Sequence, residues 1–171
     1  MNNINKNGIR NFLEEAKKDD KLFFKTRSLQ GRWNFEHGKP QFQANIVFGD
    51  NKQTTFETDL AVPMGGFGNA PDPMSYCFFG LLSCFTATIA SVATEHNIFL
   101  EKLESSITVS LDTHRVYNIN ENPITEKIQI EISLLPNTDK KLLDNIIEES
   151  KRRCPAIYCL IHPIQVDVRL K

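Results

Sequence analysis

Residues 72–95 read DPMSYCFFGLLSCFTATIASVATE, and no charged side chain occurs between Pro73 and Thr94. The Asp72-Pro73 pair is typical of a helix N-terminus, because an acidic side chain caps free N–H groups and proline is favoured at the first helical position. The length and apolar composition of the run predict one helix over 73–95. A helix that is apolar on every side must also be covered on every side, so this segment constrains the whole architecture.

A helix of this length nearly spans a bilayer, so a membrane span is the alternative. Hydroxyl side chains interrupt the run at Ser75, Ser83, Thr86, Thr88, Ser91 and Thr94. No basic anchors flank it, and apolar runs of this kind are usually buried core helices. We therefore predict a core helix and no membrane partner.

Full coverage of this helix favours a second copy of the chain. In a small domain of mixed helices and strands, one sheet face covers only one side of a helix. A second copy of the same chain is the simplest partner that can cover the other side of the helix. A stripe of small residues would let two backbones approach closely, and it consists of Gly80, Cys84, Ala87 and Ser91. The sequence thus predicts a homodimer.

The rest of the chain predicts strands and shorter helices. Apolar and polar residues alternate, as in half-buried strands, over 42–48, 107–111, 128–134 and 164–170. Two further β-rich runs, 22–35 and 54–60, complete an antiparallel meander with the first of these. A second long helix is predicted over 139–153. The expected class is α+β, with antiparallel sheets packed on two main helices.

Length and charge favour one ordinary cytoplasmic domain. The chain has 171 residues, and 20 Lys+Arg against 21 Asp+Glu give a formal net charge of −1. We predict a single domain over 1–171, with an amphipathic helix in an N-terminal extension, residues 1–21. A neutral balance offers no electrostatic attraction for nucleic acid. The first residues lack the basic and apolar regions of a signal peptide, so a cytoplasmic location is expected.

Four cysteines in a reducing compartment are buried thiols, metal ligands or redox groups. Structural zinc sites usually show two cysteine pairs, each with two to four intervening residues, or histidines at set offsets. The two cysteine pairs here have six and four intervening residues and the four histidines are isolated, so no metal is predicted. Cys77 and Cys159 are interpreted as buried packing residues, as free cysteines often are. Gly66-Phe67-Gly68 lacks the third glycine of a dinucleotide fingerprint, and no cofactor is predicted.

Cys154 stands apart because it directly precedes Pro155, where it would be the N-cap of a short helix. A helix N-terminus lowers the pKa of a thiol, and three cations just before it add positive potential. Those cations are Lys151, Arg152 and Arg153. They also suit the C-terminus of the preceding helix, and both effects can coexist.

Two stretches together carry a family resemblance. Gly65-Gly66-Phe67-Gly68-Asn69-Ala70-Pro71-Asp72-Pro73-Met74-Ser75-Tyr76, continued by Gly80-Leu81-Leu82-Ser83-Cys84, resembles the first signature of the OsmC/Ohr family of osmotically inducible and organic hydroperoxide resistance proteins. Cys154-Pro155, about seventy residues later, resembles the second. The resemblance covers roughly 22–171.

The resemblance implies an OsmC-like fold and an intertwined homodimer with both sites at the subunit interface. It further implies a thiol-dependent peroxidase of the oxidative stress response, with Cys84 as the peroxidatic and Cys154 as the resolving cysteine. The substrate would be a small organic hydroperoxide, which the apolar residues around Phe78, Phe79, Leu81 and Phe85 would suit. An external dithiol would be the reductant.

One departure from the family pattern concerns the charged partners of the thiolate. Active members resemble one another in an acidic residue soon after the helix-opening proline and in an arginine that pairs with it. Met74 occupies the place of the acid here, and Arg32 is our candidate for the arginine, the alternative being an exposed strand residue. Without this clamp, burial would raise the pKa of Cys84. The alternative functions are therefore a weakly catalytic member that binds a small apolar ligand, or a thiol redox sensor.

Overall fold

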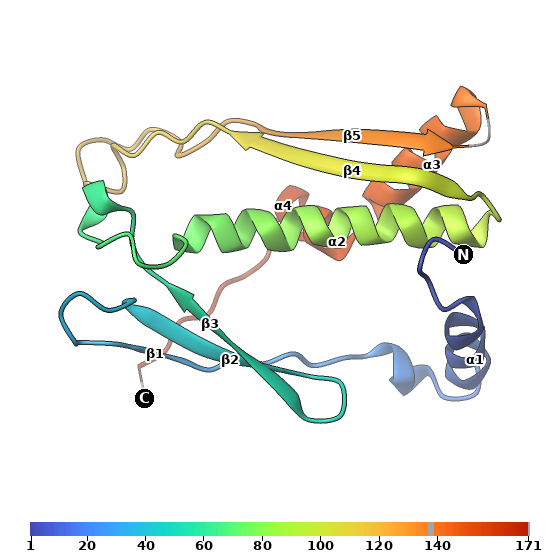
Figure 1. Cartoon of the computed structure of the whole chain (residues 1–171), viewed down its shortest axis with the longest axis horizontal. Coiled ribbons are helices and arrows are strands. Elements are labelled where there is room, and N and C mark those ends of the chain that lie inside the picture. The colour runs from blue at the N-terminus through green and yellow to red at the C-terminus, as the bar shows by residue number, and fades with distance from the viewer. Residues whose placement is uncertain (137–138, 171) are drawn as a thin grey trace. The chain divides into compact units, whose positions relative to one another are not determined.

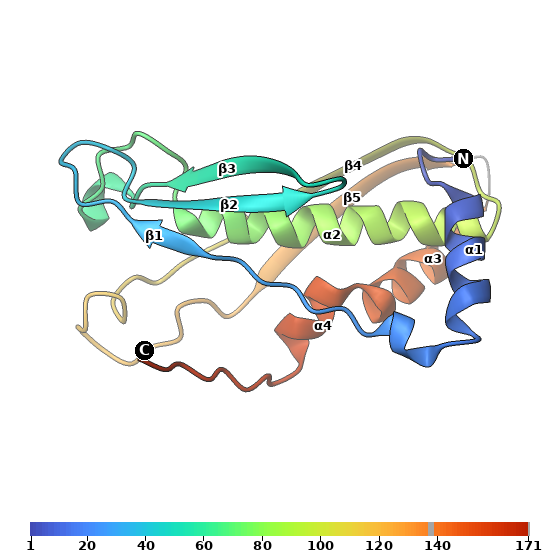
Figure 2. The ribbon, with the colours of Figure 1, turned by 90° about the horizontal axis from the view of Figure 1, so that it is seen from below.

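The computed structural model describes residues 1–136 and 139–170, which form two compact units. One unit comprises residues 9–79, and the other comprises residues 1–8 and the chain from Gly80 onward. Figures 1 and 2 show the elements of both units. Helices α1 (Lys6–Ala16) and α2 (Pro73–Glu95) each run from one unit into the other.

The unit of residues 9–79 contains an antiparallel meander. Its strands are β1 (Gly31–Trp33), β2 (Phe42–Phe48) and β3 (Lys52–Thr58), in the order β1-β2-β3. This confirms the predicted meander. The long strand predicted over 22–35 is wrong, because only Gly31–Trp33 pairs with β2, and the 3-10 helix Asp20–Phe23 occupies its start. The run 24–30 carries mainly polar side chains without strict alternation, so it has no apolar face to bury.

The glycine-rich loop before α2 is organised by Asp59, which is buried. One carboxylate oxygen of Asp59 accepts hydrogen bonds from the backbone N–H groups of Phe67 and Asn69, both at 3.0 Å. A Cβ atom on Gly66 would lie 1.5 Å from the backbone oxygen of Leu60. Glycine is therefore required at position 66 by a close approach of two backbone segments.

We expect Gly66→Ala to lower the free energy of unfolding by about 2 kcal/mol or more, since backbone must shift to admit the methyl group. Gly49→Asn is the matched control. Gly49 has φ 52° with open space around it, and asparagine tolerates that conformation. Urea unfolding of both variants checks the prediction, and equal losses would contradict it.

The second unit is built around residues 80–95 of α2. Strands β4 (Leu100–Val109) and β5 (Ile128–Pro136) form an antiparallel pair, and helices α3 (Lys140–Arg153) and α4 (Pro155–Ile161) follow. Asp139 caps α3 by accepting from the N–H of Leu142. The structure confirms both predicted long helices and the α+β class.

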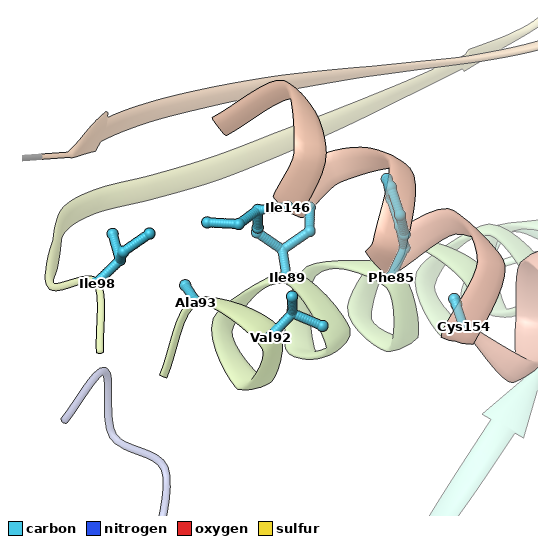
Figure 3. Packing of buried hydrophobic residues seen from close by; sticks show 7 residues of the cluster. All are labelled: Phe85, Ile89, Val92, Ala93, Ile98, Ile146 and Cys154. Atoms are coloured by element: carbon cyan, nitrogen blue, oxygen red, sulfur yellow. The ribbon is translucent and has the colours of Figure 1, made fainter. Parts of the chain in front are cut away.

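The core of this unit brings α2 and α3 together (Figure 3). Its buried residues are Phe85, Ile89, Val92, Ala93, Ile98, Ile146 and Cys154. Side chains of β4, β5 and α4 pack against this cluster, among them Leu103, Ile130 and Ile157. The arrangement places the helix junction at Cys154 inside the same core that buries α2.

Among the described residues, α2 is the one helix with the length and mean hydropathy, 1.7, of a membrane span. Core helices of soluble proteins have the same properties. Phe85 and Ile89 are 3% and 0% exposed, so this face of α2 is covered by the chain itself. Gly80 and Ala87, by contrast, are exposed.

The C-terminal strand predicted over 164–170 is wrong for the single chain. Residues 163–170 form no strand, and none of the described strands pairs with them. The apolar members of the alternation are exposed, with Val166 at 84% and Val168 at 87%. Alternation predicts a face that can be buried, but a strand forms only where a ladder partner is present.

Candidate active site: two thiols beside a helix junction

Cys84 and Cys154 lie together as free thiols. Cys84 lies on α2 and is half-buried, whereas Cys154 is fully buried, with 0% exposure. The Cys154 thiol donates a weak hydrogen bond to the Cys84 sulfur, with 3.7 Å between the two Sγ atoms. The structure thus brings together the two cysteines that the resemblance singled out, although they are 70 residues apart in the chain.

Local backbone structure explains the position of Cys154. Its N–H donates to the carbonyl of Ser150 at 2.9 Å and ends α3, while its carbonyl accepts from the N–H of Tyr158 at 2.9 Å and begins α4. It has the extended conformation, φ −73° and ψ 118°, that a residue before proline favours. The predicted N-cap position of Cys154 before a short helix is therefore confirmed.

Burial and hydrogen bonding act in opposite directions on Cys84. Burial is the largest effect and raises the pKa of its thiol above the ordinary value. The backbone N–H of Ala156, in the first turn of α4, donates to the Cys84 sulfur and lowers the pKa. The first turn of α4 therefore acts to lower the pKa of Cys84, whereas the sequence predicted this effect for Cys154.

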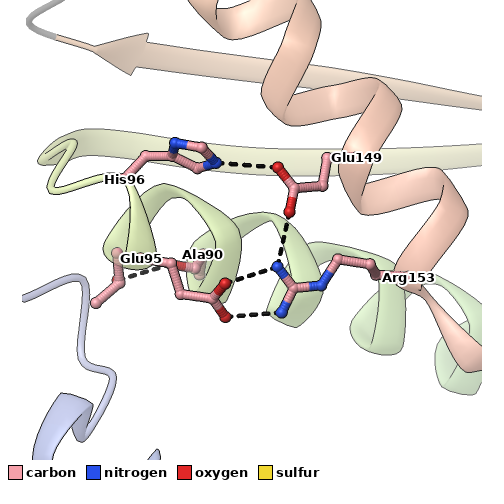
Figure 4. Close-up of polar contacts among 6 residues, drawn as sticks. Ala90, Glu95, His96, Glu149 and Arg153 are labelled. Carbon is pink, nitrogen blue, oxygen red and sulfur yellow. Dashed lines mark hydrogen bonds and ion pairs between the residues drawn. The ribbon is translucent and has the colours of Figure 1, made fainter. Parts of the chain in front are cut away.

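Two of the three cations before Cys154 are paired with acids. Arg153 binds Glu95 and Glu149 (Figure 4). Lys151 binds Glu148. The glutamate partners of Arg153 raise the pKa of its guanidinium, mainly through Glu95. The positive potential expected from these cations is therefore largely neutralised by neighbouring carboxylates.

Arg32 and Met74 belong to elements of the other unit. Arg32 lies on β1 opposite Gln43, with its side chain exposed, and its role beside a thiolate remains a prediction. Met74 is also exposed and offers a thioether where a carboxylate was expected. The nearby acid is Asp72, which accepts from the N–H groups of Met74 and Ser75 and caps α2. A hydrogen bond from the Ser75 hydroxyl is the main cause of the lowered pKa of Asp72.

The interpretation of Cys77 and Cys159 as buried packing residues is wrong for the single chain, since both are exposed. Cys77 lies near the start of α2 and Cys159 on α4, where neither belongs to the buried core. An exposed position on an apolar helix cannot be distinguished from a buried one by composition alone.

We expect the rate of Cys84 oxidation by cumene hydroperoxide to rise about tenfold per pH unit between about pH 6 and pH 8, since only the thiolate attacks. Burial raises the pKa of the Cys84 thiol above its ordinary value, so the thiolate fraction keeps growing through this interval. Single-turnover stopped-flow measurements on a Cys77→Ser/Cys159→Ser background check this. A rate plateau below pH 7 would show that the pKa is lowered instead.

Comparison with known proteins places this geometry in a family. The family profile described as "OsmC-like protein" matches residues 66–169, which contain both cysteines of the site. The chain belongs to the OsmC-like family. No curated protein matches the chain.

Solved structures share the fold at low identity. An OsmC-like protein from Mycoplasma pneumoniae is 21% identical, with a TM-score of 0.57, covering 80% of this chain and 87% of that one. An organic hydroperoxide resistance protein OsmC from Legionella pneumophila, also described as a predicted redox protein, is 16% identical, with a TM-score of 0.54, and covers 81% and 92%. An OsmC-like protein of unknown function from Vibrio cholerae is 11% identical, with a TM-score of 0.54, and covers 79% and 93%. These likenesses confirm the OsmC-like fold that the family resemblance implied.

Proposed function

We propose that this protein is a cytoplasmic thiol-dependent peroxidase that reduces organic hydroperoxides through Cys84 and Cys154. The observation that carries the proposal is the 3.7 Å contact between the two free thiols. The name of the Legionella pneumophila structure, an organic hydroperoxide resistance protein, supports the same class of reaction.

The proposed cycle has three balanced steps. The Cys84 thiolate attacks a hydroperoxide oxygen, the O–O bond breaks, and the alkoxide leaves and takes up a proton as the alcohol, while Cys84 becomes a sulfenic acid. The Cys154 thiol then attacks that sulfur, a disulfide forms, and the hydroxyl leaves as water. An external dithiol returns both cysteines to thiols and becomes a disulfide itself.

The surroundings of Cys84 favour an organic substrate over hydrogen peroxide. Leu81, one turn earlier on α2, is buried, and Cys84 packs against the buried core cluster. Apolar surroundings stabilise an alkyl or aryl group but offer nothing to hydrogen peroxide. Phe85 belongs to the core, whereas Phe79 is exposed.

Hydroperoxide consumption with dithiothreitol as the reductant tests the proposal. We expect turnover of cumene hydroperoxide, with at least a tenfold lower kcat/KM for hydrogen peroxide. Equal values for the two peroxides would reject the organic specificity. No consumption of either would reject the peroxidase.

A thiol redox sensor is the second candidate, favoured by the raised pKa of Cys84 and by Met74 in place of an acid. Both features slow the reaction with peroxide. A sensor would form the Cys84–Cys154 disulfide once without sustained turnover. The same assay separates the two candidates, because only the peroxidase consumes many equivalents per chain.

We further propose that the working form is a homodimer. Two apolar surfaces support this: the exposed stretch of α2 at Gly80 and Ala87, and the exposed alternating residues 164–170. Exposed apolar surfaces of this kind are typical of protein–protein interfaces, and a second copy of the chain is the simplest partner that can cover them.

Sedimentation velocity at micromolar concentration should give about 39 kDa, twice the chain mass of 19.5 kDa. Val166→Glu should weaken the dimer, since Val166 lies on the apolar face of the C-terminal alternation. Gln165→Glu, on the opposite face, is the control. A clean monomer in the unmodified protein would contradict the proposal.

A further inference from the structure

We propose that Arg153 and Glu95 form a positioning pair that holds Cys154 against Cys84 for disulfide formation. The consequence for catalysis rests on the proposed peroxidase function, but the positioning itself does not. Neither residue belongs to the two cysteine signatures, and neither contacts a reacting atom.

The pair is a two-point contact between the last residues of two helices. Arg153 is the last residue of α3 and Glu95 is the last residue of α2. Their side chains form a bidentate salt bridge (Figure 4). Nη1 of Arg153 donates to Oε2 of Glu95 at 2.6 Å, and Nη2 donates to Oε1 at 2.7 Å. Such bidentate geometry fixes orientation as well as distance.

The contact controls how far along α2 the end of α3 lies. Arg153 is bonded directly to Cys154, while Glu95 follows Cys84 by eleven residues on the same helix. At about 1.5 Å per residue, that interval is roughly 16 Å of α2. Because α2 is one continuous helix, fixing Arg153 to Glu95 also fixes Cys154 relative to Cys84.

A second set of polar contacts joins the ends of α3 and α2. Nη1 of Arg153 also donates to Glu149 at 2.8 Å, and the other oxygen of Glu149 lies 2.9 Å from Nε2 of His96. His96 directly follows α2, so the last turn of α3 is joined to the end of α2 at two points. The histidine is also the main cause of the lowered pKa of Glu149.

Exposure indicates that this network sets geometry more than stability. The side chains of Arg153 and Glu95 are 36% and 35% exposed. Ion pairs at such exposure contribute little to folding free energy. Disulfide closure, however, is sensitive to position, because the sulfurs must move from 3.7 Å to a bond length of about 2.0 Å. A small slide of α3 would lower the effective concentration of Cys154 at Cys84.

The thiol–disulfide equilibrium tests this without any hydroperoxide. Proteins on a Cys77→Ser/Cys159→Ser background would be equilibrated with reduced and oxidised dithiothreitol. The fraction bridged between Cys84 and Cys154 would then be measured by mass. We expect Arg153→Met and Glu95→Gln each to lower the equilibrium constant about tenfold. The double variant should lose little more, since both substitutions remove the same Arg153–Glu95 contact.

Two further variants separate positioning from general damage. Lys151→Met removes a neighbouring cation whose ion pair, with Glu148, lies within its own helix, and it should leave the equilibrium constant within twofold. Arg153→Lys keeps the positive charge but cannot form the bidentate contact. Its equilibrium constant is expected to lie between those of the unmodified protein and Arg153→Met. After one equivalent of cumene hydroperoxide, Arg153→Met should oxidise Cys84 at the normal rate but close the disulfide more slowly.

The inference is overturned if the equilibrium constant of Arg153→Met equals that of the unmodified protein, or if Lys151→Met lowers the constant as much as Arg153→Met does. It is also overturned if the unmodified protein forms no Cys84–Cys154 bridge. A protein that bridges as expected but consumes no hydroperoxide would reject the peroxidase and leave the positioning role intact.

Discussion

Cys84→Ser is expected to abolish the consumption of cumene hydroperoxide, with a loss of about a thousandfold or more to the rate without protein. A serine hydroxyl fits the half-buried position of Cys84 but has no accessible anionic form near neutral pH and forms no stable oxidised state. The first step of the cycle therefore has no nucleophile. Steady-state assays with excess dithiothreitol measure the loss.

Cys77→Ser is the matched control, because Cys77 is also on α2, one heptad earlier, and is exposed. It should retain activity within about twofold. Circular dichroism and thermal unfolding should be nearly unchanged in both variants. Retained activity in Cys84→Ser would exclude Cys84 as the attacking thiol.

Cys154→Ser is expected to separate the two oxidation steps. Cys84 should still be oxidised at the normal rate, since the attacking thiolate is unchanged. The sulfenic acid then lacks the Cys154 thiol, whose sulfur lies 3.7 Å from that of Cys84 in the unmodified protein. Cys84 should accumulate as sulfenic acid, trapped by dimedone, and excess hydroperoxide should drive it to sulfinic acid.

Intact mass after one equivalent of hydroperoxide gives the measurement for this variant. The dimedone adduct should rise at least about tenfold over the unmodified protein, in which disulfide formation outruns trapping. Cys159→Ser is the control, since Cys159 lies on α4 and is exposed. Equal dimedone labelling of Cys154→Ser and the unmodified protein would exclude Cys154 as the resolving cysteine.

The long helices could be predicted from features that lie close together in the sequence. α2 begins at Pro73 and ends at Glu95, as predicted, because Asp72 and Pro73 mark its start and no charge interrupts it until Glu95. Asp139 marks the start of α3 in the same way. Caps and periodicity depend on neighbours in the chain, so a sequence can show them.

Features that depend on distant partners were missed. The alternation over 164–170 is that of a strand, yet no described strand of the single chain pairs with it. Asn2 was overlooked, although its amide donates to Thr94 and to the carbonyl of Ile98. A polar residue near a terminus carries no local sign of such a contact.

The site itself was predicted unevenly. Cys154 had a local signal in the following Pro155, whereas its pairing with Cys84 came from the family resemblance. The Arg153–Glu95 contact could not be predicted, since surface arginines and glutamates are common and only tertiary structure selects the pair. The donation from Ala156 to Cys84 is a backbone contact and leaves no trace in residue type.

Peptide mapping of the protein after one equivalent of cumene hydroperoxide, without reductant, tests the two-cysteine cycle most directly. We predict one mole of hydroperoxide consumed and one disulfide formed per chain, joining Cys84 to Cys154, with Cys77 and Cys159 left as thiols. Consumption without that disulfide, or a disulfide through Cys77 or Cys159, would contradict it.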